Sequence, residues 1–195
     1  GSWRATVMPP ASGVKSLRRL QDGAGKVKPG KVNGAVSKGQ IRGAGMSRAF
    51  VFPGQGAQAI GMGKALAEAY PVARAVFDEV DEALEEKLSA LIWQGDIAEL
   101  TLTQNAQPAL MATSMAAMAA LGAEGLGIQQ GDFVAGHSLG EYSALCAAGS
   151  LSLSDTARLL RIRGKAMQEA VPVGVGAMAA LLGLDFVAAA EVAAE

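Results

Sequence analysis

The chain has 195 residues, of which 50% are hydrophobic and only 5% aromatic, and its formal net charge is −1. This length suits one domain or slightly more, with a core made mainly of aliphatic side chains and methionine. No apolar run reaches the roughly 18–20 residues that a membrane-spanning helix needs, so no membrane partner is expected. The single cysteine, Cys146, excludes an intrachain disulfide, and one cysteine with one histidine gives no basis for a metal site.

Charge is unevenly distributed along the chain. Residues 1–45 carry nine Lys and Arg and one acidic residue, whereas residues 46–195 carry eight Lys and Arg and 17 acidic residues. The basic segment is rich in Gly, Lys, Ser and Pro without hydrophobic periodicity, so a disordered leader is expected over 1–46. It is interpreted as added or upstream sequence that precedes Met46, with an organelle transit peptide and a nucleic-acid-binding tail as alternatives. Sparse arginine and the lack of interleaved aromatic residues favour the first interpretation, and no nucleic-acid partner is expected.

The ordered part is expected to begin near Arg48, with a short strand over Ala49–Phe52 that a Pro-Gly turn ends. Apolar periodicity then predicts a series of helices. Their expected ranges are 64–70, 71–84, 88–93, 96–100 and 108–121, with a connection over 101–107. The acidic residues of the second helix, Asp81 among them, are predicted to lie on its solvated faces.

The helix over 108–121 is apolar on nearly every side, so it should be central and buried, with Pro108 in its first turn. Its methionines, Met111, Met115 and Met118, are interpreted as core. A glycine-rich loop over 122–131 separates it from the second half of the chain.

The second half begins with an apolar run, Phe133–Ala135, that predicts a buried strand. Two helices should follow, the first over 141–148 and ended by Gly149, the second capped by Ser154 and Asp155 and continuing through Met167. A strand over 177–182 and the opening of a helix over 185–195 are predicted at the end.

One pentapeptide, Gly136-His137-Ser138-Leu139-Gly140, lies between a predicted strand and a predicted helix. G-x-S-x-G in this context is typical of a nucleophile elbow, which exposes the serine above the end of the sheet. The turn strains the serine backbone, and the flanking glycines remove side chains that would collide. The alternative is a glycine-rich turn with an incidental serine. Cys146, on the helix after the elbow, is interpreted as a small core residue rather than a nucleophile.

Two further features are compatible with acyl chemistry at the elbow. The turn Pro53-Gly54-Gln55-Gly56 has free backbone N–H groups that would supply a second oxyanion donor, although an isolated Pro-Gly turn is more often only structural. Arg163, on a largely apolar helix, would hold a substrate carboxylate through two parallel hydrogen bonds, although an isolated arginine is more often an exposed helix cation.

Together these segments resemble the malonyl-CoA:acyl-carrier-protein transacylases of bacterial type II fatty-acid synthesis. The chain is also similar to the acyltransferase domains of polyketide and animal fatty-acid synthases. The resemblance covers about residue 47 to the end of the chain and is carried by four segments. They are Pro53-Gly54-Gln55-Gly56-Ala57-Gln58, Gln107-Pro108-Ala109-Leu110, Gly136-His137-Ser138-Leu139-Gly140-Glu141-Tyr142-Ser143-Ala144 and Arg163-Gly164-Lys165-Ala166-Met167-Gln168.

The resemblance implies a role for six residues. Ser138 would be the catalytic nucleophile that takes the malonyl group from malonyl-CoA, and the backbone N–H groups of Gln55 and Leu139 would form the oxyanion hole. Arg163 would bind the malonyl carboxylate, and Gln107 and Met167 would line the substrate pocket. The phosphopantetheine thiol of holo acyl carrier protein would then attack the acyl-serine, in ping-pong covalent catalysis. Malonyl-CoA is expected as a substrate, with no permanently bound cofactor.

The sequence departs from the family pattern after the serine. The family has a catalytic histidine well beyond it, whereas the 195 residues end 57 positions after Ser138 and contain one histidine, His137. His137 adjoins the nucleophile and is predicted to be a packed residue that points away from the hydroxyl. A chain truncated in this way is expected to be weakly active or inactive, since a positioned general base contributes about 10²–10⁴-fold.

The fold class predicted is α/β, with a hydrolase-like acyltransferase core over 47–173, a parallel sheet, and the start of an incomplete ferredoxin-like subdomain over 174–195. A monomer in the bacterial cytoplasm is expected, or in an organelle if the leader is a transit peptide. Two other functions stay open. They are a serine thioesterase or other hydrolase, and a non-catalytic fragment that binds carrier protein or coenzyme A.

Overall fold

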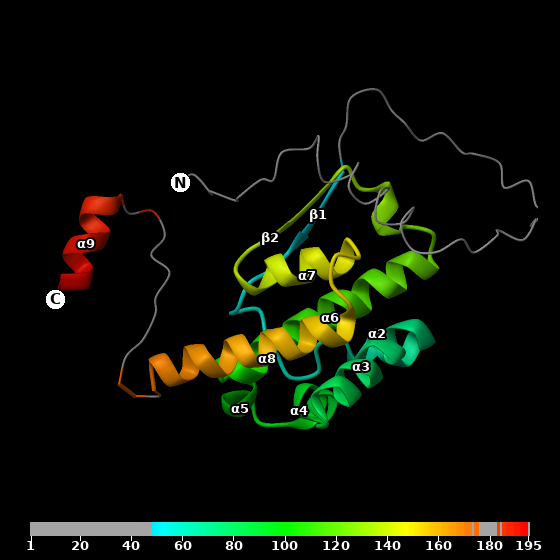
Figure 1. Ribbon diagram of the computed structural model, residues 1–195, viewed down its shortest axis with the longest axis horizontal. Helices are drawn as coiled ribbons and strands as arrows, with labels where there is room; N and C mark the ends of the chain where they lie inside the picture. The colour runs from blue at the N-terminus through cyan, green and yellow to red at the C-terminus, as the bar shows by residue number, and fades with distance from the viewer. Residues whose placement is uncertain (1–47, 173, 176–182, 184, 195) are drawn as a thin grey trace, which may run out of the picture.

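A computed structural model describes residues 48–172, 174–175, 183 and 185–194, and Figure 1 shows the arrangement of its strands and helices. The strands β1 (Ala49–Phe52) and β2 (Phe133–Gly136) pair in parallel, with Ala49 opposite Phe133 and Phe52 opposite Gly136. The described part is therefore mostly helical with a small parallel sheet. The predicted leader over 1–46 and the predicted strand over 177–182 lie outside the described residues.

The helices agree closely with the apolar periodicity of the sequence. The described ones are α2 (Lys64–Ala69), α3 (Pro71–Leu84), α4 (Leu88–Gln94), α5 (Ile97–Thr101), α6 (Thr103–Ala123), a 3-10 turn η1 (Ile128–Gln130), α7 (Leu139–Ala147), α8 (Leu153–Ala170) and α9 (Phe186–Ala194). The ends of α2 to α5 shift by at most one residue from the prediction, and α9 confirms the helix expected there. None of the described helices combines the length and the apolar character that crossing a bilayer requires.

The beginning of α6 corrects the sequence prediction. The helix starts at Thr103, so the connection predicted over 101–107 is wrong and Pro108 lies inside the helix. Proline has no N–H, so the carbonyl of Gln104, four residues earlier, loses its helical donor. Nη1 of Arg161 on α8 donates to that carbonyl oxygen at 2.6 Å. A side chain 57 residues away therefore supplies the hydrogen bond that the proline removes.

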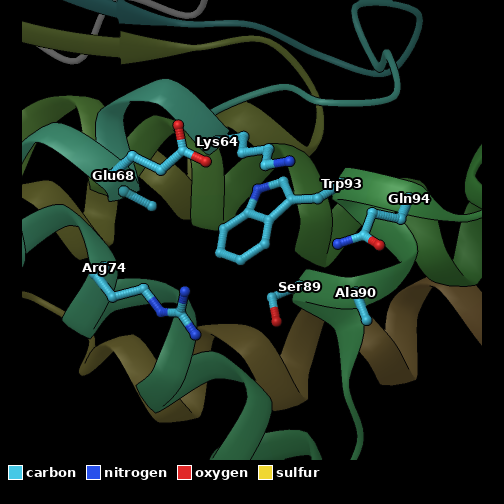
Figure 2. Close-up of a pocket in the computed structure, with 8 residues that line it drawn as sticks. Lys64, Glu68, Arg74, Ser89, Ala90, Trp93 and Gln94 are labelled. Carbon is cyan, nitrogen blue, oxygen red and sulfur yellow. The ribbon is translucent and has the colours of Figure 1, made fainter.

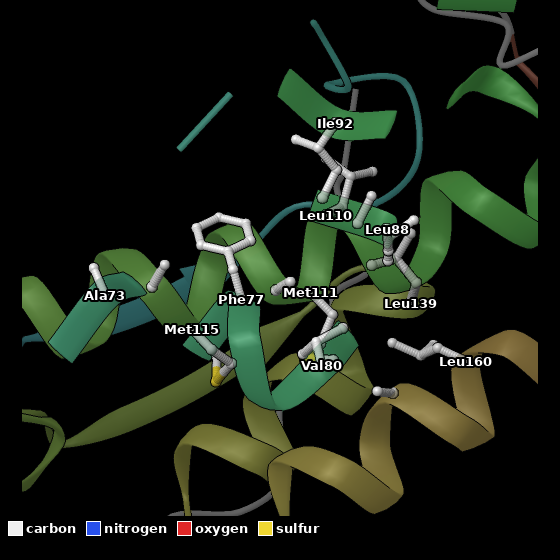
Figure 3. Close-up of a cluster of buried hydrophobic side chains, with 14 of the residues drawn as sticks. Ala73, Phe77, Val80, Leu88, Ile92, Leu110, Met111, Met115, Leu139 and Leu160 are labelled. Atoms are coloured by element: carbon white, nitrogen blue, oxygen red, sulfur yellow. The ribbon is translucent and has the colours of Figure 1, made fainter. Parts of the chain in front are cut away.

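The apolar core is centred on α6, as predicted (Figure 3). Met111 and Met115 are buried, and Met118 packs against the same cluster, which confirms these methionines as core. Phe77 of α3 is 1% exposed and meets Trp93 of α4 edge to face, with ring centroids 5.0 Å apart. Helices α3, α7 and α8 all pack on α6. The core therefore fixes the relative positions of these helices, and with them the positions of their polar side chains.

The sheet is less buried than the sequence predicts. Phe50 and Phe52 pack toward the helices, in keeping with the two-residue period of a strand. Val51 and Val134 are 71% and 36% exposed, and Phe133 and Ala135 are only partly buried, so the prediction of a buried strand over 133–135 is wrong.

The inward face of α3 also differs from the prediction, because it includes a charged residue. Asp81 is 4% exposed rather than solvated. Its carboxylate accepts hydrogen bonds from the backbone N–H and the hydroxyl of Ser89 at 2.8 and 2.7 Å, and lies 3.7 Å from the Lys87 ammonium. These partners offset the loss of hydration and join the end of α3 to the start of α4.

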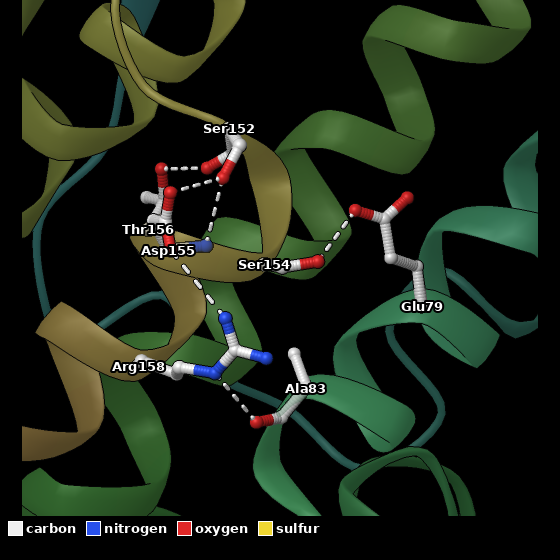
Figure 4. A network of polar contacts seen from close by, with 7 residues as sticks. All are labelled: Glu79, Ala83, Ser152, Ser154, Asp155, Thr156 and Arg158. Carbon is white, nitrogen blue, oxygen red and sulfur yellow. Dashed lines mark hydrogen bonds and ion pairs between the residues drawn. The ribbon is translucent and has the colours of Figure 1, made fainter.

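The first turn of α8 is fixed by a side-chain N-cap and by bonds to α3 (Figure 4). Ser152, not Ser154, is the cap: its hydroxyl accepts from the N–H of Asp155 at 3.0 Å and donates to the Asp155 carboxylate at 2.7 Å. Ser154 instead donates to Glu79 of α3 at 2.8 Å, and Nε of Arg158 donates to the carbonyl of Ala83 at 3.2 Å. The helix that carries Arg163 is thus attached to the body at its start.

The buried carboxylate of Asp81 can be tested by substitution. In Asp81→Ala, the hydroxyl and N–H of Ser89 lose their acceptor, so the free energy of unfolding in urea should fall by about 2–3 kcal/mol. Asp78→Ala is the matched control, because Asp78 forms an exposed i,i+4 pair with Arg74 at 3.0 Å. That variant should lose no more than about 0.5 kcal/mol. Equal losses in the two variants would contradict the structural role of Asp81.

Candidate active site

Ser138 occupies the sharp turn between β2 and α7. Its backbone has φ 55° and ψ −113°, in a region that residues with a side chain rarely adopt. The serine is exposed at the end of the sheet, directly before the first turn of α7. The predicted nucleophile elbow is therefore present, with the backbone strain that the sequence pattern implies.

The two glycines of the elbow are required by close backbone contacts. A Cβ at Gly136 would overlap the carbonyl of Gly140, and a Cβ at Gly140 would overlap the carbonyl of Phe52 in β1. The N–H of His137 also donates to the Phe52 carbonyl at 3.1 Å. The elbow thus lies in close contact with the end of β1. A larger residue at position 136 or 140 would separate the elbow from that strand.

Three of the predicted substrate residues meet beside Ser138. Nη2 of Arg163 lies 3.0 Å from Oγ of Ser138, and its Nη1 donates to Oε1 of Gln107 at 2.6 Å. Nε2 of Gln107 lies 3.3 Å from the sulfur of Met167, and Gln107 is fully buried. The buried amide therefore fixes one side of the guanidinium and leaves the other side directed at the serine hydroxyl.

The predicted oxyanion donors lie on two segments that the structure brings together. Leu139 is the first residue of α7, where the N–H has no partner within the helix, and its side chain is 1% exposed in the core. The turn with Gln55 runs along the elbow: a Cβ at Gly54 would lie 3.0 Å from the carbonyl oxygen of His137. The side-chain amide of Gln55 is 3.4 Å from the hydroxyl of Thr103, at the start of α6.

His137 does not contact the serine hydroxyl through any hydrogen bond among the described residues. Its ring lies against Gly54, where a Cβ would come within 2.5 Å of Nδ1. The residue is exposed, so the expectation of a packed histidine is not met.

Cys146 is partly buried on α7 and packs against the core. Burial raises the pKa of its thiol, which lowers the fraction of reactive thiolate at neutral pH. The interpretation of Cys146 as a core residue is confirmed.

Tyr142 is a site residue that the sequence reasoning missed. The guanidinium carbon of Arg163 lies 5.8 Å from the centre of its ring, within the range of a cation–π contact. Tyr142 follows Ser138 by four residues, about one helical turn, so this spacing alone would have placed it on the serine side of α7.

A cavity of about 330 Å³ lies elsewhere, between α2, α3 and α4 (Figure 2). Lys64, Glu68, Arg74 and Trp93 line it, and the Arg74 guanidinium sits 5.1 Å from the centre of the Trp93 ring. Its lining mixes both signs of charge and includes none of the predicted site residues. The candidate active site is therefore the exposed surface around Ser138.

A family model for the acyl transferase domain matches residues 49–193, and the chain belongs to this family. It is similar to the malonyl CoA-acyl carrier protein transacylase of Bacillus subtilis strain 168, with 60% identity over 137 residues, which are 70% of this chain and 42% of the relative. The Escherichia coli K12 transacylase of the same name is 49% identical over 141 residues, 70% of this chain and 44% of the relative. The chain thus spans less than half the length of these curated relatives.

The chain also matches solved structures of malonyl transferases, again over less than half of their length. The crystal structure of the acyl-carrier-protein-S-malonyltransferase from Bartonella henselae matches with a TM-score of 0.70 and 63% identity, over 75% of this chain and 47% of that one. A complex of a type II polyketide-synthase acyl-carrier protein with its malonyl-transacylase matches with a TM-score of 0.61 and 46% identity, over 65% and 40%.

The contact between the elbow and β1 predicts the effect of adding one methyl group. Gly140→Ala would drive a Cβ into the Phe52 carbonyl, so the free energy of unfolding should fall by about 3 kcal/mol or more. Gly122→Ala is the control, since a Cβ there meets nothing within 4 Å and the residue lies in α6. It should be neutral or stabilising by up to about 1 kcal/mol, and urea unfolding of both variants measures the difference. A Gly140→Ala variant as stable as the unchanged protein would refute the close contact.

Proposed function

We propose that the protein transfers a malonyl group from malonyl-CoA to the phosphopantetheine thiol of acyl carrier protein, through a malonyl-serine on Ser138. The observation that supports this most directly is the position of Arg163, with Nη2 at 3.0 Å from Oγ of Ser138 and Nη1 held by Gln107. A fixed cation beside an acyl-accepting hydroxyl favours an acyl group that ends in a carboxylate. The names of the similar transacylases agree with that substrate.

The first half-reaction forms the acyl-enzyme. Oγ of Ser138 attacks the thioester carbonyl, the carbon–sulfur bond breaks, and the serine proton ends on the sulfur of coenzyme A. The carbonyl oxygen becomes an oxyanion, for which the N–H groups of Leu139 and Gln55 are the proposed donors, each contributing about 2.7–4 kcal/mol. His137 is not proposed as the base, because its ring lies against Gly54.

The second half-reaction reverses the first with a different thiol. The phosphopantetheine thiol of holo acyl carrier protein attacks the malonyl-serine, the carbon–oxygen bond breaks, and the proton returns to Oγ of Ser138. The holo carrier protein is therefore proposed as the protein partner. One of the matched structures is a complex of an acyl-carrier protein with its malonyl-transacylase.

Substrate selection is assigned to Arg163, Gln107 and Met167. When malonyl occupies Ser138, its carboxylate replaces the serine hydroxyl as the acceptor for Nη2 of Arg163. Gln107 keeps Nη1 occupied, while the ring of Tyr142 lies 5.8 Å from the guanidinium carbon. The sulfur of Met167 accepts from the buried Gln107 amide, which supports the proposal that Met167 lines the acyl pocket beside Gln107.

The finer architecture is part of the same proposal. Residues 47–173 form the hydrolase-like acyltransferase core, and residues 174–195 begin a ferredoxin-like subdomain. The two described strands belong to the parallel sheet of that core, and α9 to the subdomain. The proposed location is the bacterial cytoplasm.

Labelling with radioactive malonyl-CoA, followed by a chase with holo acyl carrier protein, tests the function. We expect label on Ser138 that moves to the carrier protein, and no label in Ser138→Ala. Loss of label to water at the rate of the chase would show a thioesterase or other hydrolase instead. A protein that binds carrier protein or coenzyme A without taking label would be a non-catalytic binding fragment.

Arg163 can be tested by comparing two acyl donors. In Arg163→Ala, acylation by malonyl-CoA should fall about 10- to 100-fold, because a charge-assisted hydrogen bond contributes about 1.5–3 kcal/mol. Acylation by acetyl-CoA, which has no carboxylate, should change much less. Lys165→Ala, an exposed cation on the same helix, is the control and should leave both rates unchanged. Equal losses for both donors in Arg163→Ala would reject the carboxylate assignment.

A further inference from the structure

Arg161 and Arg163 project from α8 on either side of the helix face that carries Gly164. Both side chains contact residues of α6. Residues 161 and 163 are separated by about 200° around a helix axis, because each residue turns the helix by about 100°. Gly164 brings the two helices into close contact: a Cβ there would lie 2.6 Å from Cα of Gln104. The first turns of α6 are therefore held between the two arginine side chains.

Arg163 reaches Gln107 on one side, and Arg161 reaches the preceding turn on the other. Nη1 of Arg161 donates to the carbonyl of Gln104 at 2.6 Å and to Oδ1 of Asn105 at 2.5 Å. Its Nη2 forms an ion pair with Glu86, in the segment between α3 and α4. The arginine side chain is 11% exposed, and burial lowers the pKa of its guanidinium.

The bond to Gln104 compensates for a specific defect in the helix. Pro108 cannot donate to the Gln104 carbonyl, so the turn that ends at Gln107 lacks its normal backbone bond. Arg161 replaces that donor from outside the helix. Gln107 directly precedes Pro108 in this turn, and its side-chain amide orients Arg163.

We propose that Arg161 is a positioning residue for the acyl site: by bonding the carbonyl that Pro108 leaves without a donor, it holds Gln107 where Gln107 orients Arg163. The inference rests on the proposed malonyl transfer, since it concerns the selectivity of that site. Arg161 itself touches neither Ser138 nor Arg163 through any hydrogen bond among the described residues. Its effect is therefore expected on the choice of acyl group rather than on serine reactivity in general.

The matched variants are Arg161→Ala and Arg158→Ala. Arg158 is also an α8 arginine that donates to a backbone carbonyl, that of Ala83 at 3.2 Å, but it lies on the α3 side. Arg161 borders a cavity of about 240 Å³ that Asn105 and Glu86 also line, so water can occupy the place of the missing guanidinium and Arg161→Ala should fold. Thermal unfolding of both variants establishes that they do.

The measurement is the rate of Ser138 acylation by malonyl-CoA and by acetyl-CoA, followed by mass spectrometry in a single turnover. Arg161→Ala should lower the malonyl-to-acetyl rate ratio roughly 10- to 100-fold, since a small displacement of a positioning group has effects of this size. Arg158→Ala should leave the ratio unchanged. Arg161→Lys keeps the positive charge but not the paired donors. Its malonyl-to-acetyl rate ratio should lie between the ratios of the unchanged protein and of Arg161→Ala.

A second substitution tests the route through the carbonyl. Adding Pro108→Ala to Arg161→Ala restores an N–H at residue 108 that can donate to Gln104, so the double variant should recover part of the lost ratio. No recovery would show that Arg161 does not act through this carbonyl and would overturn the inference.

The other outcomes separate the inference from the proposed function. If Arg161→Ala and Arg158→Ala change the ratio equally, Arg161 has only a general structural role and the inference fails alone. If the unchanged protein takes no malonyl group onto Ser138, the proposed function fails and the inference fails with it.

Discussion

The site depends on the contact between the backbones of α6 and α8 at Gly164. A Cβ at that position would lie 2.6 Å from Cα of Gln104 and 2.8 Å from the carbonyl oxygen of Thr103. This approach lets side chains on either side of the glycine bridge the two helices: Gln168 accepts from the N–H of Thr103 at 3.3 Å, and Arg163 donates to Gln107 at 2.6 Å. With a larger residue at 164 the helices would separate, and Arg163 would lose the buried amide that sets its orientation.

A second close backbone contact places the serine. The elbow lies against the end of β1 because Gly136 and Gly140 have no side chains, and the same contact brings the turn with Gln55 beside it. Ser138 directly precedes α7 and Arg163 lies on α8, so their positions depend on two helices whose separation is set by the apolar core around α6. A core of small residues and methionines suits this purpose, since it allows three helices to approach the central one closely.

Local signals were sufficient for much of this architecture. The strand ends, Pro71 at the start of α3 and the strained serine of the elbow were all predictable, since each depends on neighbours in the sequence. Two of the failures have distant causes: the hydrogen bond that Pro108 removes from α6 is replaced by Arg161 of α8, and Asp81 is buried with Ser89 of α4 as its partner. The sequence pattern named Ser138, Arg163, Gln107 and Met167, and the structure brings these four together. The four-residue spacing from Ser138 places Tyr142 on the serine side of α7, but its contact with Arg163 depends on how α7 and α8 pack, which no local signal gives.

The backbone of Ser138 holds strain of the order of 1–3 kcal/mol, which a glycine at the same position would release. The surrounding contacts, not the serine itself, keep it in this conformation. Ser138 thus stands at a position where backbone strain alone would favour glycine. A screen of this chain for thermal stability would therefore tend to select replacements of Ser138, the side chain proposed to carry the acyl group.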